Sequence, residues 1–162
     1  VVGLFESVVA HLAIIVSFQS LILDMSGNAG TQSLAVTIRV LMDEQVSGKQ
    51  KLLLIRKEAR VGVVNGLILG VLSALLVGAY LILFKGQPVL LAVSVSLCTG
   101  LALLLSVVLS GLSGTVIPIL FKRLNVDPAV ASGPLITTIN DLIAVVTFYG
   151  LVWMLLINIL HF

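Results

Sequence analysis

Long runs of apolar residues, interrupted at a few points by polar clusters, make up most of the sequence. A helix needs roughly 20 apolar residues to cross a bilayer core of about 30 Å. By this measure the sequence predicts the end of one membrane-spanning helix followed by four full ones. The predicted helices cover residues 1–5, 8–42, 61–84, 88–121 and 134–160.

Two of these helices carry further structural signals. The 34 uncharged residues of 88–121 would extend over about 51 Å as a helix, so we expect a bend near Gly111, Gly114 and Pro118. The helix predicted over 61–84 has a small residue at every fourth position, and such ridges let helices pack closely in lipid. The residues of this ridge are Gly62, Gly66, Gly70, Ala74 and Gly78.

Composition supports a membrane location for the whole chain. Of 162 residues, 59% are hydrophobic and 10% are charged, and the mean hydropathy is +1.24, whereas soluble domains carry about 25% charged residues. These proportions exclude a soluble enzyme domain, a disordered segment and a nucleic-acid-binding module. We therefore predict an all-α integral membrane protein that is embedded in the lipid bilayer. The sequence also lacks hydrolase, metalloprotease and phosphate-loop motifs, so it indicates no enzymatic activity.

The basic residues predict the orientation in the membrane. Eight of the nine Lys and Arg residues lie in segments 39–60 and 122–127, which are predicted loops on the same side, and only Lys85 lies opposite. The positive-inside rule places these two loops in the cytoplasm of a plasma-membrane protein and the C-terminus outside. The acidic residues of the first loop are expected to be solvated. They are Asp43, Glu44 and Glu58.

Asp141 is the one charged residue in the last predicted helix, and no basic residue lies within the apolar part of any helix to pair with it. A carboxylate at the centre of a membrane helix costs at least about 2.5–3.5 kcal/mol. Asp141 is therefore expected to be protonated, to face water or to meet a cation. Thr137 and Thr138 precede it by four and three residues and share its helix face. This pattern favours an ion pathway with Asp141 as the metal-binding residue.

A second polar cluster interrupts the helix predicted over residues 8–42. Asn28 and Gln32 supply amide oxygens four residues apart, and Gly27 and Gly30 would permit an irregular backbone that lines a cavity. Asp24 lies one helical turn before Asn28 and is a candidate additional acidic site facing the same cavity.

These ligand types indicate a class of ion. Oxygen ligands without Cys or His suit Mg²⁺, Mn²⁺ or Ca²⁺. One carboxylate per chain is too little for a dehydrated divalent ion, but Mg²⁺ retains water and is commonly held by one or two carboxylates. A two-fold axis would bring two Asp141 side chains together, which predicts a homodimer with a pore at the subunit interface. Selectivity among Mg²⁺, Mn²⁺, Co²⁺ and Ca²⁺ stays open, because all of them take oxygen ligands.

The sequence contains MSGNAGTQ at 25–32 with Arg39 following, and DPA at 127–129 followed by GPLITTIND at 133–141. These two motifs resemble signatures of the MgtE family of magnesium channels. The resemblance covers essentially the whole chain and corresponds to the transmembrane domain of the family. It implies five helices per subunit, the first only partly present here, and a homodimeric pore lined by the second and fifth helices. It also implies that the cytosolic N-terminal and CBS domains of the family are absent from this chain.

The resemblance also assigns individual residues. It places Asp141 at the position that binds hydrated Mg²⁺ in the family. The pore-facing positions that it implies are Asn28, Gly30, Gln32, Gly133, Thr137 and Thr138. Ser20 and Asp24 stand where the family usually has proline and glycine, so the second helix is expected to bend differently and to carry extra charge. The sequence thus predicts a magnesium channel or transporter. A proton- or Na⁺-coupled divalent cation transporter and a non-conducting membrane subunit or ion sensor remain as alternatives.

Overall fold

The computed structural model describes residues 13–42, 46–131 and 134–159, and the secondary structure of these ranges is entirely helical. The prediction of an all-α fold is therefore confirmed. The predicted helix end at 1–5 lies outside the described residues. The elements are α2 (Ala13–Leu41), α3 (Gly48–Leu83), α4 (Val89–Arg123), the 3₁₀ helix η2 (Pro128–Ala131), α5 (Pro134–Leu151) and the π-helical segment η3 (Val152–Ile159).

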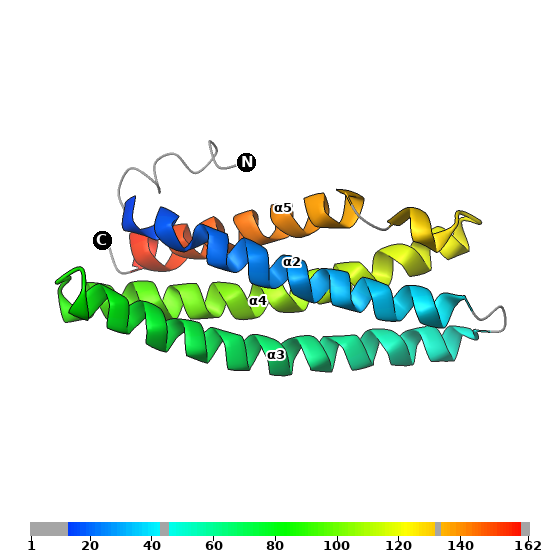
Figure 1. Cartoon of the computed structure of the whole chain (residues 1–162), viewed down its shortest axis with the longest axis horizontal. Coiled ribbons are helices and arrows are strands. Elements are labelled where there is room, and N and C mark those ends of the chain that lie inside the picture. Colours follow the sequence, from blue (N-terminus) through cyan, green and yellow to red (C-terminus); the bar gives the residue numbers. More distant parts are fainter. Residues whose placement is uncertain (1–12, 43–45, 132–133, 160–162) are drawn as a thin grey trace.

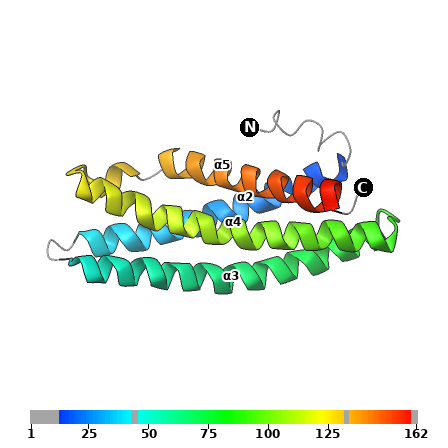
Figure 2. The same ribbon diagram turned by 180° about the vertical axis from the view of Figure 1, so that it is seen from behind.

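The four long helices run antiparallel in chain order, and α4 lies at the centre (Figures 1 and 2). It packs against α2, α3 and α5, whereas α2 and α3 touch each other only slightly. The end of α2, the start of α3 and the end of α4 lie at one end of the bundle, and the α3–α4 turn lies at the other. Most basic residues therefore gather at one end.

Three segments in the described part of the chain are long and apolar enough to cross a membrane. They are Gly48–Leu83, Val89–Arg123 and Pro134–Leu156. Helix α2 has 29 residues, and its length of about 44 Å would suffice for a crossing. It is not among these three segments, so a membrane crossing by α2 stays a prediction.

Helix α3 begins at Gly48, so most of the loop predicted over 39–60 is in fact helical. A capping box starts the helix, because Gln50 N–H donates to Ser47 Oγ (3.3 Å) and Ser47 N–H donates to Gln50 Oε1 (2.7 Å). The residues that follow are mostly Lys, Leu, Arg and Glu, which are good helix formers. The loop prediction was wrong because the charges mark where the apolar run ends and not where the helix ends.

The small-residue ridge of α3 packs directly against α4, as predicted. A Cβ atom placed on Gly66 would lie 2.9 Å from the carbonyl oxygen of Leu104, and one on Gly70 would lie 2.6 Å from that of Gly100. The two backbones therefore touch without a side chain between them, which is how small residues hold helices together in lipid.

Helix α4 is continuous, with Pro118 in its interior. In both views its C-terminal part diverges from α3 and runs toward η2. Pro118 lies in this part of the helix, and proline favours a bend because it lacks the N–H that would continue the helical hydrogen bonds and its ring crowds the preceding turn. Near the end of the helix, the Lys122 ammonium group donates a hydrogen bond to the carbonyl oxygen of Leu41, the last residue of α2. This bond joins the ends of two helices.

Candidate functional site

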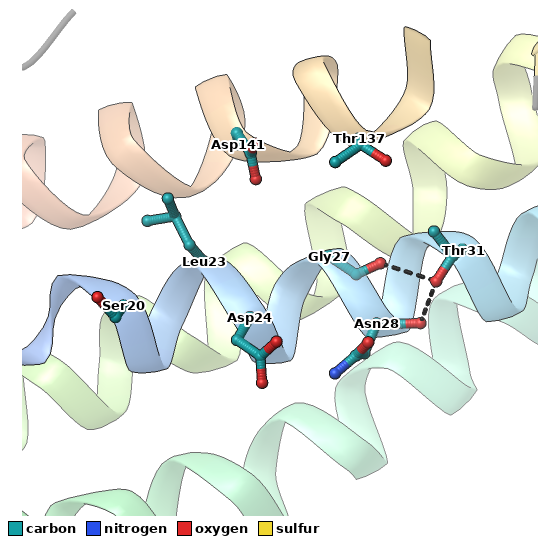
Figure 3. A pocket seen from close by; sticks show the side chains of 8 residues that line it. All are labelled: Ser20, Leu23, Asp24, Gly27, Asn28, Thr31, Thr137 and Asp141. Atoms are coloured by element: carbon teal, nitrogen blue, oxygen red, sulfur yellow. Dashed lines mark hydrogen bonds between the residues drawn. The ribbon is translucent and has the colours of Figure 1, made fainter. Parts of the chain in front are cut away.

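A groove between α2 and α5 contains members of both polar clusters found in the sequence (Figure 3). Its volume is about 420 Å³, and its residues come from one face of each helix. We call it the α2–α5 groove. It is lined by Ser20, Leu23, Asp24, Gly27, Asn28, Thr31, Thr137 and Asp141.

Helical spacing explains how these residues reach one groove. Ser20, Asp24 and Asn28 follow one another at intervals of four residues, which places them on one face of α2. Thr137 and Asp141 have the same spacing on α5. Figure 3 shows Asp141 and Thr137 projecting toward α2, whereas Asp24 and Asn28 extend from the side of α2 away from α5. The polar side chains of α5 therefore point into the groove. Those of α2 line its edge and are exposed at the exterior of the bundle.

The two carboxylates of the groove have no counter-charge among the residues that the structure describes. Asp141 is partly buried and Asp24 is exposed, and within the described ranges neither side chain makes a hydrogen bond or an ion pair. Unpaired charge in an apolar bundle is costly unless water or a cation accompanies it. The negative charge of the groove therefore favours cations.

The groove offers oxygen ligands without forming a closed metal cage. Among the residues that the structure describes, no group of three or more His, Cys, Asp or Glu side chains could hold a metal ion. Carboxylate, hydroxyl and amide oxygens suit hard cations, and a Mg²⁺ ion held by few carboxylates keeps several of its waters. The arrangement can thus hold a hydrated cation through its water molecules.

The polar stretch of α2 keeps regular helical structure. The helix runs without interruption from Ala13 to Leu41, so the irregular backbone predicted at Gly27 and Gly30 does not occur. The Thr31 hydroxyl donates to the carbonyl oxygens of Gly27 and Asn28, both at 3.0 Å. Because an α-helix satisfies its backbone groups internally, this stretch needs no special environment at membrane depth. Side chains, and not free carbonyl groups, supply the groove with oxygen atoms.

Gly30 does not line the groove, because it faces Asn140. A Cβ atom on Gly30 would approach Asn140 Nδ2 to 2.1 Å. Asn140 is completely buried, and its Oδ1 accepts a hydrogen bond from Ser113 Oγ (2.8 Å). Asn140 directly precedes Asp141, so its packing against α2 and α4 fixes the rotation of α5 that presents Asp141 to the groove.

Two more residues predicted for the site lie elsewhere. Thr138 is exposed, and its hydroxyl donates to the carbonyl oxygen of Pro134 (2.7 Å). Gln32 lines a different cavity, next to Glu58. Gly133 lies outside the described residues. The groove therefore unites only part of the predicted set.

Sequence reasoning missed some polar residues of the structure. Ser20 and Thr31 line the groove, and their helical spacing from Asp24 was the signal that could have identified them. Glu58, expected to be solvated, has an exposed fraction of only 6%, and it accepts a hydrogen bond from Ser33 Oγ (2.8 Å). That prediction was wrong because burial of Glu58 depends on α2, whose Ser33 lies 25 residues earlier.

Known proteins resemble this chain over most of its length. A family model for MgtE, described as a divalent cation transporter, matches residues 19–151, which include the whole groove. A magnesium transporter MgtE of Bacillus subtilis is 36% identical over 151 residues, which are 93% of this chain and 32% of that protein. Proteins of the same name from Enterococcus faecalis and Thermus thermophilus are 37% and 34% identical, over 91% and 94% of this chain.

The matches cover most of this chain but only part of each relative. The chain spans about a third of the length of these curated relatives, with shares of 32%, 30% and 32%. Together with three helices able to cross a bilayer, the matches identify a multi-pass membrane protein. Because the family model covers most of the chain, this protein belongs to the MgtE family of divalent cation transporters.

Proposed function

We propose that this chain forms the ion-conducting part of a magnesium transporter, in which two copies enclose a pore along their α2–α5 grooves. Asp141 is the central ion-binding carboxylate of this pore. The observation that carries the proposal is that this carboxylate lies in a polar groove and forms no ion pair with any residue that the structure describes. The names of the relatives support Mg²⁺ as the ion.

A second copy would solve the physical problem of the exposed polar groups. Asp24, Asn28 and Thr137 are exposed in the single chain, and polar groups facing lipid are costly. Two grooves facing each other would shield these groups from lipid and surround one aqueous path. Each subunit would contribute Asp141 and Asp24, which is enough negative charge for a divalent ion that keeps its waters.

The neutral residues of the groove would then act on the water shell of the ion. Asn28 and Thr31 provide side-chain oxygens at the level of the polar stretch. Mg²⁺ dehydrates reluctantly, so a pore that accepts hydrogen bonds from bound water avoids the cost of removing it. In this proposal the bundle end that carries most basic residues faces the cytoplasm, in keeping with the positive-inside rule.

Flux through the purified chain tests the proposal against its alternatives. In liposomes that contain a Mg²⁺-sensitive dye, we expect Mg²⁺ entry driven by the Mg²⁺ gradient and membrane potential alone. Flux that requires a proton or Na⁺ gradient would instead indicate coupled transport. Mg²⁺ binding without any flux would indicate a non-conducting subunit or sensor. Protein-free liposomes provide the baseline.

Asp24→Asn is expected to raise the Mg²⁺ concentration for half-maximal flux about three- to tenfold. Asp24 is exposed, so water screens its charge, and its attraction for the ion amounts to roughly 1 kcal/mol. The measurement is the concentration dependence of liposome flux. Ser20→Ala, a neutral change in the same groove, is the control and should leave this concentration unchanged. An unaltered value for Asp24→Asn would place Asp24 outside the ion path.

A further inference from the structure

A second cavity, of about 250 Å³, lies where α2, α3 and α4 meet. It shares no lining residue with the α2–α5 groove. Its apolar and glycine residues come from all three helices. Its polar lining consists of Gln32 and Ser33 from α2 and Lys57, Glu58 and Asn65 from α3.

Glu58 is the chemically notable group of this cavity. It is 94% shielded from solvent, and one carboxylate oxygen, Oε2, accepts the Ser33 hydroxyl at 2.8 Å. Within the described part of the chain, no other hydrogen bond and no basic side chain reaches this carboxylate. The other oxygen is not one of the fully enclosed atoms that lack a partner, so part of its surface is accessible, and Glu58 is one of the residues that line the cavity. A buried carboxylate that is ionised in this position needs a compensating positive charge.

We propose that this cavity binds a monovalent metal cation of the size of Na⁺, held by the Glu58 carboxylate and the side-chain oxygens of Gln32, Ser33 and Asn65. Hard oxygen donors of this kind suit hard cations. One carboxylate balances one positive charge. Lys57 is the other charged residue of the lining, but it is an exposed residue and makes no ion pair with Glu58 among the described residues, so this carboxylate is left to be balanced by a bound cation.

The position of the cavity gives the bound cation a structural role. Helices α2 and α3 make little direct contact, and the donors come from both of them. A cation at Glu58 would therefore connect α2 to α3. Gln32 and Ser33 follow Asn28 by about one turn, so the same connection would hold the part of α2 that lines the groove.

Thermal unfolding of the purified chain tests this site separately from the pore. The background variant carries Asp24→Asn and Asp141→Asn, which removes both carboxylates of the groove. Na⁺ replaces an organic cation at constant ionic strength, without divalent ions. We expect Na⁺ at about ten times its Kd to raise the melting temperature by roughly 3–6 °C. Adding Glu58→Gln should abolish this rise, whereas adding Asp127→Asn, which removes an exposed charge outside both cavities, should preserve it.

A milder variant keeps the test decisive if Glu58→Gln does not fold. Asn65 is exposed at the cavity and makes no hydrogen bond with another described residue. Asn65→Ala should therefore leave the melting temperature without Na⁺ unchanged while weakening the Na⁺ response several-fold.

Three results would overturn the proposal. They are no stabilisation by Na⁺ in the background variant, an undiminished Na⁺ response after Glu58→Gln or Asn65→Ala, and a response to Mg²⁺ that depends on Glu58 in place of the response to Na⁺. The Mg²⁺ pore proposal would survive all three, because it depends on flux and on Asp141.

Discussion

Replacing Asp141 by asparagine is expected to lower Mg²⁺ uptake about a hundredfold at concentrations that limit occupancy of the pore. Asparagine keeps the shape of the side chain and one oxygen but removes the charge. A divalent ion held through its water shell would lie about 5 Å from each of the two Asp141 carboxylates that the variant removes from the dimer, and at an effective dielectric constant of about 80 their combined attraction is ~3 kcal/mol. A difference of about 1.4 kcal/mol corresponds to a factor of ten, so this loss corresponds to roughly two orders of magnitude.

Uptake in cells depleted of their own magnesium transporters measures this effect, normalised to the amount of protein in the membrane. Asp127→Asn is the matched control. It removes the same charge from an exposed turn, and the asparagine oxygen can still accept the Ala129 N–H, which Asp127 Oδ1 accepts at 2.9 Å. This control should retain uptake. Wild-type uptake by the Asp141 variant, or an equal loss in both variants, would contradict a specific role for Asp141.

Gly114→Ala is expected to destabilise the bundle by about 3 kcal/mol, near the upper end of the usual cost of overpacking. A Cβ atom at Gly114 would lie 2.2 Å from the carbonyl oxygen of Gly30 and 3.1 Å from the backbone nitrogen of Leu34. Both neighbours are backbone atoms of α2, so no side-chain rotation can relieve the contact. The two helices would have to separate. Thermal unfolding in detergent should show a melting temperature lower by about 6–12 °C.

Gly150→Ala provides the control for this experiment. Gly150 lies in α5, and a Cβ atom there would have no neighbour within 4 Å. Alanine is the better helix former by about 1 kcal/mol, so this variant should match the wild type or exceed it slightly in stability. Equal melting temperatures for the two variants would contradict the close α2–α4 contact.

The fold class could be predicted from the sequence because apolar runs long enough for a bilayer leave few alternatives to helices. The ends of the helices were harder to predict. In α3 the helix continues through a charged segment that begins at Gly48, and hydropathy records the loss of apolar residues there but not the persistence of helical hydrogen bonds. Local capping at Ser47 was the better guide to where α3 starts.

The candidate site likewise contains residues that could be predicted from the sequence and residues that could not. Asp141 could be identified because an unpaired charge within an apolar run is unusual in any membrane helix. Asn140 and Glu58 could not, because each is buried by a helix distant in the sequence. Ser113 of α4 bonds to Asn140, and Ser33 of α2 bonds to Glu58. Gly30 illustrates the reverse error, since a glycine within a polar motif contacts another helix and not the groove.

The unbroken course of α2 has a mechanical consequence. From Leu41, where Lys122 of α4 is bonded, to Asn28 in the groove, the helix rises about 20 Å with no interruption. A helix with intact hydrogen bonds has no hinge that could absorb a displacement, so it moves as a rigid body. A shift at the end of α4 would therefore move Asn28 and Asp24 together past Asp141. In the proposed pore, the hydrogen bond of Lys122 to Leu41 would therefore act, together with the packing of α2 on α4, on the position of Asn28 and Asp24 relative to Asp141.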